Sequence, residues 1–197
     1  HNILCLSGDD PKNGDQPETT VVNDIDSLTL VATANMMCKE KKFPSGREIE
    51  PPPTLFIGGA EAPTEGKPNP EKILNKIKTG VNFFQTQFVF DTIILKEYMK
   101  VLEDSGILEK TFFIIGLGPF ASANSAKWMN ENLFGVDVPE KIINRLEQAQ
   151  DAKKESKNIC QELIYEFKEI KGVKGIHLMG HNKEEEIAEI IQEARKS

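Results

Sequence analysis

The stretch that decides the fold covers residues 80–91 and reads GVNFFQTQFVFD. Aromatic and β-branched residues dominate it, which is typical of a β-strand, and we predict a strand over residues 81–90. Gly80 comes just before this strand and is a natural end for a preceding helix. Gln85 and Gln87 interrupt the apolar run, and they share one face of a regular strand because strand side chains alternate.

Short apolar runs elsewhere in the chain predict four more strands, at residues 2–6, 54–57, 111–115 and 173–179, the second ending at Gly58-Gly59. Helical spacing predicts helices at residues 27–42, 71–79, 92–103, 122–132, 139–150, 153–171 and 184–194, the first capped by Asp26 or Ser27. Apolar strands that alternate with helices indicate an α/β fold with a parallel sheet. Periodicity does not distinguish an open doubly wound sheet from part of a (βα)8 barrel.

Composition excludes several classes of protein. The 197 residues carry a net charge of -7, which disfavours nucleic acid as a partner because such binders present a basic surface. No apolar run reaches the roughly 18 residues of a membrane span. The three cysteines lack CxxC spacing, and no cluster of metal-ligand residues is visible, so we expect neither a metal nor disulfides, and a cytoplasmic location.

The loop after the first predicted strand reads SGDDP from Ser7. Gly8 allows a ligand to approach the backbone closely, and Asp9 places a carboxylate at the mouth of the sheet. A plain turn with an aspartate cap explains the same residues.

Three further features have both a structural and a functional interpretation. An amide such as Gln85 or Gln87 on a buried face costs about 1–3 kcal/mol if unpaired, so either a neighbouring group or a ligand such as a pterin satisfies it. Lys72 and Lys76 lie four residues apart on one helix face and form either a solvated stripe or a phosphate anchor. His177 lies within a predicted strand, where a structural histidine is favoured over a proton shuttle.

Taken in order, several segments resemble the methylenetetrahydrofolate reductases. They are residues 6–11, 24–27, 56–60, 80–91 and 172–179, and residues 80–91 carry the most specific motif. Residues 128–132 and 138–140 resemble the branch of the family found in acetogens, in archaea and in fusions with a methyltransferase.

The resemblance implies a (βα)8 barrel of which residues 1–197 form the C-terminal part, from the fourth strand to the eighth. Five units leave two open sheet edges, so we expect an oligomer, or completion by a missing N-terminal segment or a partner chain. The general-acid glutamate of the family lies on the first strand, and this chain is therefore expected to be inactive alone.

The implied activity is flavin-dependent reduction of 5,10-methylenetetrahydrofolate to 5-methyltetrahydrofolate, in one-carbon metabolism and methionine biosynthesis. FAD is the implied cofactor, and NADH, NADPH or a redox protein is the electron donor. The resemblance places FAD at Gly8, Asp9, Asn69, Lys72 and Lys76, with Asp9 as the catalytic carboxylate. The same alignment places the folate at two residues, Gln87 and Lys183.

Four positions depart from the better-known bacterial branch. Ser7 replaces an arginine, which removes a cationic partner for the FAD phosphate, and Asn23 replaces an aromatic residue. Pro63 and Met129 replace a flavin-contacting histidine and a folate-packing aromatic residue. One alternative is a non-catalytic half-barrel that binds folate or a partner subunit. A corrinoid-dependent methyltransferase is another, and residues 85–87 argue against it.

Overall fold

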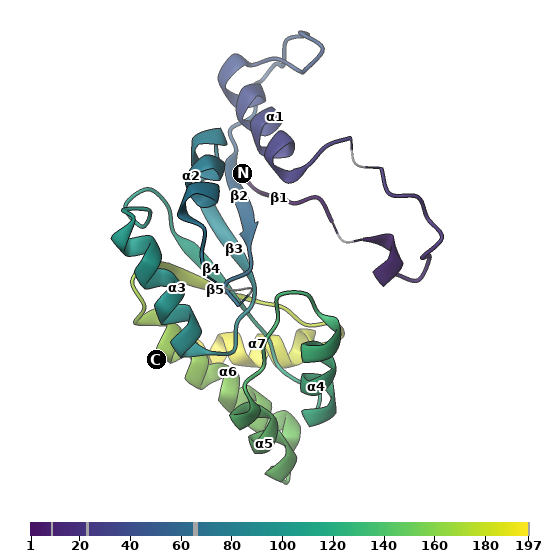
Figure 1. Ribbon diagram of the computed structural model, residues 1–197, viewed down its shortest axis with the longest axis vertical. Helices are drawn as coiled ribbons and strands as arrows, with labels where there is room; N and C mark the ends of the chain where they lie inside the picture. Colours follow the sequence, from purple (N-terminus) through teal and green to yellow (C-terminus); the bar gives the residue numbers. More distant parts are fainter. Residues whose placement is uncertain (9, 23, 65–66, 197) are drawn as a thin grey trace. The chain divides into compact units, whose positions relative to one another are not determined.

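The chain alternates strands and helices along its length, as the computed structural model in Figure 1 shows. The structure describes residues 1–8, 10–22, 24–64 and 67–196. The strands are β1 (Asn2–Cys5), β2 (Phe56–Glu61), β3 (Phe83–Phe88), β4 (Phe113–Leu117) and β5 (Val173–Leu178). The helices are α1 (Ser27–Glu40), α2 (Pro70–Thr79), α3 (Thr92–Asp104), α4 (Ala123–Asn132), α5 (Glu140–Gln148), α6 (Ala152–Lys168) and α7 (Glu184–Ala194), and a short 3-10 helix spans Pro11–Asn13.

The strands form one five-stranded sheet in the order β1-β2-β3-β4-β5. The β1–β2, β3–β4 and β4–β5 ladders are parallel, so the predicted α/β fold with a parallel sheet is confirmed. The order follows the chain and contains no reversal of the kind that defines a doubly wound sheet. Consecutive strands of a (βα)8 barrel have this sequential order.

The chain divides into two compact units, which we call the first unit (residues 1–60 and 71–83) and the second unit (residues 61–70 and 84–197). In the first unit, Asp26 caps α1 by accepting a hydrogen bond from the backbone N–H of Thr29 at 2.7 Å, as predicted. The side-chain amide of Asn35 on α1 donates to the carbonyl of Thr79 at 2.8 Å. This bond ties the middle of α1 to the last residue of α2.

The glycine pair at residues 58 and 59 lies inside β2, so the prediction that this strand covers residues 54–57 and ends at the pair is wrong. The cause is the ring of Phe83, which packs directly over Gly58. A Cβ atom at Gly58 would lie 2.5 Å from Cζ of Phe83. The same ring stacks on Phe56 with 5.4 Å between centroids. The strand therefore needs a glycine where it passes beneath an aromatic ring.

The core of the second unit is built on aromatic side chains from its strands. Phe84 of β3 stacks on Phe113 of β4 with 5.1 Å between ring centroids, and neither side chain is exposed. The ring centroids of Phe90, which follows β3, and Phe120, which follows β4, lie 4.6 Å apart. Helix α6 packs against β5 and contributes the buried side chains Ile159, Cys160, Leu163, Ile164 and Phe167.

Several helix boundaries differ from those predicted, by one to three residues. Helix α5 begins at Glu140 with Pro139 preceding it, and α6 ends at Lys168 instead of continuing to residue 171. Helix α2 ends at Thr79, directly before Gly80, as predicted.

The Gly58→Ala substitution tests the close packing in β2. We expect a loss of about 1–3 kcal/mol in the free energy of unfolding, because the new methyl group collides with the Phe83 ring. Gly175→Ala is the matched control within a strand, since its Cβ would meet Ile114 at an ordinary 3.9 Å. We expect that change to be neutral or to stabilise by up to about 1 kcal/mol in urea denaturation. Equal effects of the two changes would contradict this packing.

Candidate functional site

The carboxyl ends of β3, β4 and β5 meet in the second unit, and we call this region the carboxyl edge. Ligands of parallel α/β proteins bind outside this end of the strands. A Cβ atom at Gly116 of β4 would lie 2.5 Å from the carbonyl oxygen of Thr86 and 2.6 Å from that of Gln87. One at Gly118 would collide with the carbonyl of Met179, just beyond β5. The two glycines therefore let β3 and the chain after β5 approach β4 closely.

The β3–β4 ladder has an irregularity at the carboxyl edge. Gln85 pairs with Ile114 and Phe88 with Gly116, so two residues of β3 face one of β4 between these pairs. The hydroxyl of Thr86 accepts a hydrogen bond from the N–H of Gly116 and donates to the carbonyl of Gln87, both at 2.8 Å. Such a bulge redirects side chains and interrupts the regular alternation assumed for Gln85 and Gln87.

Gln87 has partners within the protein. Its Nε2 donates to the carbonyl of Phe134 at 3.3 Å, and its Oε1 accepts from the N–H of Phe88 at 3.0 Å. The hydroxyl of Thr64 donates to the carbonyl of Gly135, the residue that follows Phe134. The half-buried amide is thus satisfied by neighbouring backbone, and its longer bond is the one that a ligand would replace most readily.

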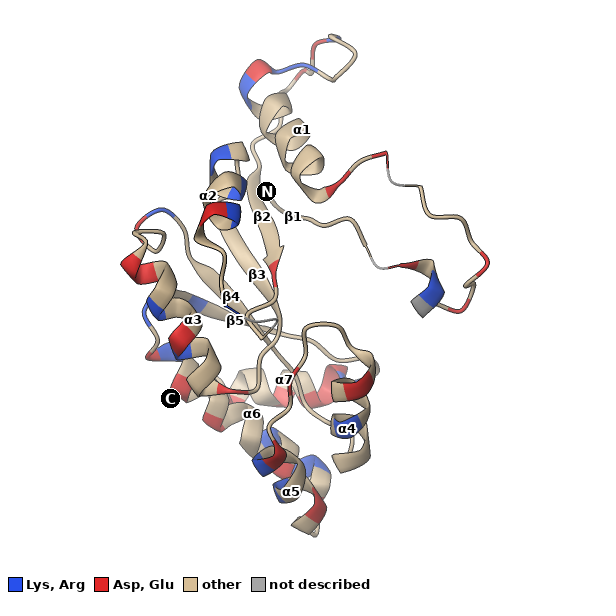
Figure 2. Cartoon of the chain, in the orientation of Figure 1, with Lys and Arg blue, Asp and Glu red and all other residues tan. Residues whose placement is uncertain are grey.

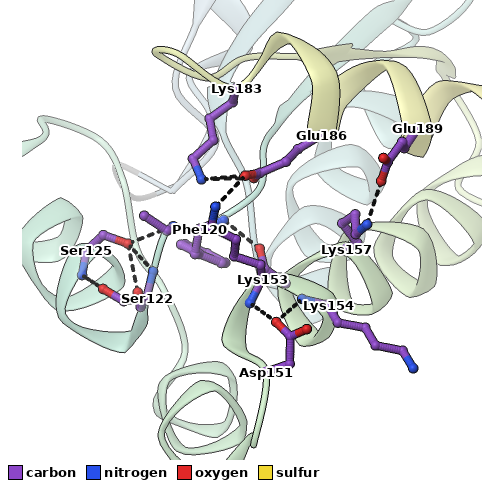
Figure 3. Close-up of polar contacts among 12 residues, drawn as sticks. Phe120, Ser122, Ser125, Asp151, Lys153, Lys154, Lys157, Lys183, Glu186 and Glu189 are labelled. Carbon is purple, nitrogen blue, oxygen red and sulfur yellow. Dashed lines mark hydrogen bonds and ion pairs between the residues drawn. The ribbon is translucent and has the colours of Figure 1, made fainter.

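Lys183 precedes the first residue of α7, and its ammonium group binds one carboxylate. Its Nζ lies 2.9 Å and 3.0 Å from the two oxygens of Glu186, as Figure 3 shows. Only 14% of the Lys183 side chain is exposed. Glu186 was not among the site residues predicted from the sequence, although the spacing of three residues at the start of a helix is the signal that indicates such a pair.

His177 lies in β5, where it pairs with Gly116 of β4. Burial lowers the pKa of its imidazole, which favours the neutral form.

The first unit contains a cavity of about 100 Å³. Its lining comprises Cys5, Leu6, Ser7, Ser27, Leu28, Val31, Gly59, Ala60, Lys76 and Val81. The ammonium group of Lys76 donates to the carbonyl of Ala60 at 2.7 Å, which fixes the cation at the cavity wall. Burial raises the pKa of the Cys5 thiol, which disfavours a reactive thiolate.

Among the described residues, the other predicted cofactor residues do not line this cavity. Lys72 is an exposed residue of α2, which carries several basic side chains (Figure 2), and Asn69 is exposed just before this helix. Gly8 has a φ of 79°, a conformation that favours glycine. Asp9 and Asn23 lie outside the described residues. The structure thus brings Ser7 and Lys76 to one cavity, and places Gln87 and Lys183 with separate partners in the second unit.

The cavity of the first unit suits part of a dinucleotide such as FAD. The ammonium group of Lys76 and the hydroxyl-bearing residues Ser7 and Ser27 suit a phosphate. The apolar side chains beside them suit a flat ring. Whole small-molecule ligands occupy pockets of about 300–1,000 Å³. The cavity, at about 100 Å³, is therefore large enough for only a part of such a ligand.

Fold and site together define an α/β protein of parallel βα units with its polar groups at the carboxyl edge. The chain belongs to the methylenetetrahydrofolate reductase family, whose model matches residues 1–195. No curated protein matched it.

A solved structure with the same fold is described as an uncharacterised protein from Clostridium thermocellum that binds two copies of 5-methyl-5,6,7,8-tetrahydrofolic acid. The two chains are 22% identical with a TM-score of 0.53, and the match covers 72% of this chain and 53% of that one. This chain therefore spans about half the length of the solved protein.

In the part of the chain that the structure describes, no helix is both long and apolar enough to cross a membrane. Over the same residues, no group of three or more histidine, cysteine, aspartate or glutamate side chains is arranged to hold a metal ion.

Substitution of Thr86 tests the bulge at the carboxyl edge. Thr86 is 4% exposed, so Thr86→Val leaves the Gly116 N–H buried without its partner. We expect a loss of about 1–3 kcal/mol in the free energy of unfolding. Thr86→Ser keeps the hydroxyl and is expected to lose only about 1 kcal/mol for the missing methyl group. Chemical denaturation of both variants makes the comparison, and a valine variant as stable as the native chain would refute the role of this hydroxyl.

Proposed function

We propose that this chain is the C-terminal part, over residues 1–197, of a single flavin-dependent reductase domain that converts 5,10-methylenetetrahydrofolate to 5-methyltetrahydrofolate. The observation that carries the proposal is the family match over residues 1–195. The solved protein of the same fold is described as binding 5-methyltetrahydrofolate, which is the product of this reaction. That likeness supports a folate as the ligand of the carboxyl edge.

Two side chains of the second unit are proposed to bind the folate. The amide of Gln87 offers one donor group and one acceptor, which suits the amide-like edge of a pterin. A ligand would replace its 3.3 Å bond to the Phe134 carbonyl, the weaker of its two contacts. Lys183 supplies a cation with donors for a ligand oxygen.

The residues proposed to hold FAD are Gly8, Asp9, Asn69, Lys72 and Lys76. Lys76 has the best-defined place among them, with its ammonium group at the wall of the first unit's cavity. FAD, when bound, supplies the hydride. Asp9 is proposed as the catalytic carboxylate because its negative charge stabilises a cation that develops on the folate.

Partners and location follow from the same proposal. NADH, NADPH or a redox protein reduces the flavin, and the chain associates with further strands or a second copy to cover its open edges. Its three cysteines are free, which supports a reducing cytoplasm. A non-catalytic folate-binding half-barrel differs in one observable property, because it binds folate without taking up flavin.

The Lys76→Ala substitution tests the flavin site. We expect the full chain to take up FAD and become yellow, and the variant to bind FAD about 10- to 100-fold more weakly, because a charged hydrogen bond contributes about 1.5–3 kcal/mol. Flavin fluorescence during titration measures this affinity. Lys78→Ala is the matched control, since Lys78 is an exposed residue of the same helix. A chain that takes up no FAD, or equal affinities of the two variants, would count against the proposed flavin site.

A further inference from the structure

The ion pair at the start of α7 differs from its neighbours in burial. The side chains of Lys183 and Glu186 are 14% and 19% exposed. One turn along α7, Glu189 pairs with Lys157 of α6 at 2.5 Å, but the Glu189 side chain is 56% exposed and that of Lys157 is 29% exposed. Exposed pairs contribute little free energy because water screens them, whereas a largely buried pair fixes the geometry of its groups.

The carboxylate of Glu186 lies near two lysines, Lys183 and Lys153, and contacts the first more closely. Both of its oxygens contact Lys183, at 2.9 Å and 3.0 Å, while Lys153 of α6 lies 3.7 Å from one of them. The Lys153 side chain is 69% exposed, so its contact with Glu186 is the weaker one. Figure 3 shows the Lys183 and Glu186 side chains turned toward each other beside α6. The carboxylate thus serves mainly to hold Lys183.

An ammonium group has three N–H donors, and none of its atoms accepts a hydrogen bond. Two contacts of the Lys183 ammonium group go to Glu186, which leaves one donor for another oxygen. Because the carboxylate also neutralises the charge, the remaining donor suits a single oxygen acceptor better than a group with several negative charges.

We propose that Glu186 is a positioning residue for folate binding, which it serves by holding the Lys183 ammonium group toward one oxygen of the ligand. The inference rests on the proposed function, which places the folate at Lys183. The oxygen belongs either to the pterin carbonyl or to a carboxylate of the glutamate tail. The residue itself acts only through Lys183.

Glu186→Gln tests this role, because the amide keeps the shape of the carboxylate and loses its charge. We expect the Kd for 5-methyltetrahydrofolate, measured by calorimetry on the full chain, to rise about tenfold. We also expect Lys183 to be acylated at least about threefold faster by an amine-reactive ester, measured by mass spectrometry, because its ammonium group loses the partner that shields it. Glu186→Asp keeps the charge and should restore part of both properties.

Glu189→Gln is the matched control on the same helix, and it should change neither the Kd nor the acylation of Lys183. 6-Methyltetrahydropterin, which lacks the benzoylglutamate part, identifies the oxygen. Weaker binding of both ligands to the Glu186→Gln variant would support the role through the pterin carbonyl, and weaker binding of the folate alone would support it through the tail carboxylate.

Unchanged acylation of Lys183 in Glu186→Gln would overturn the proposal, as would faster acylation with unchanged folate affinity. Failure of the unsubstituted chain to bind folate would overturn the proposed function and this role with it. The acylation result would still report the ion pair in that case, so the two failures are distinguishable.

Discussion

The candidate site depends on a steric constraint at two glycines, Gly116 within β4 and Gly118 just after it. Side chains at these positions would collide with the backbone of Thr86 and Gln87 on one side and of Met179 on the other. Their absence brings the ends of β3 and β5 close to β4, and the Thr86 hydroxyl then bonds the Gly116 N–H. Backbone proximity, more than any charged group, therefore brings the residues of the carboxyl edge together.

The two units offer different chemistry. The first unit lines its cavity with Lys76 and two serines, which suits a phosphate. The second unit presents Gln87 and Lys183 near the carboxyl edge, which suits the amide and carbonyl groups of a pterin or the carboxylates of its tail. The activity proposed for this chain would use both kinds of group, because it requires a dinucleotide and a folate.

The sequence predicted the five strands, their parallel arrangement and the seven α-helices of the described residues, because apolar patterning and helix caps are local signals. It failed at Gly58, since the need for glycine there comes from Phe83, which lies far along the chain. The bulge near Gln87 leaves no local mark, because its cause is an extra residue relative to β4. Glu186 has a visible spacing from Lys183, but the burial that makes this pair matter comes from tertiary packing.

Folate binding at the carboxyl edge of β3, β4 and β5 is the part of the proposed function on which the other assignments depend. The most direct measurement is a titration of the isotope-labelled chain with 5-methyltetrahydrofolate, followed by nuclear magnetic resonance. We expect saturable shifts in the signals of the Gln87 side-chain amide and of the backbone amides of Gly116 and Gly118. The backbone amide signal of Gly172, which directly precedes the amino end of β5, should not shift. Shifts confined to the amino ends of the strands, or no shifts at saturating ligand, would contradict the claim.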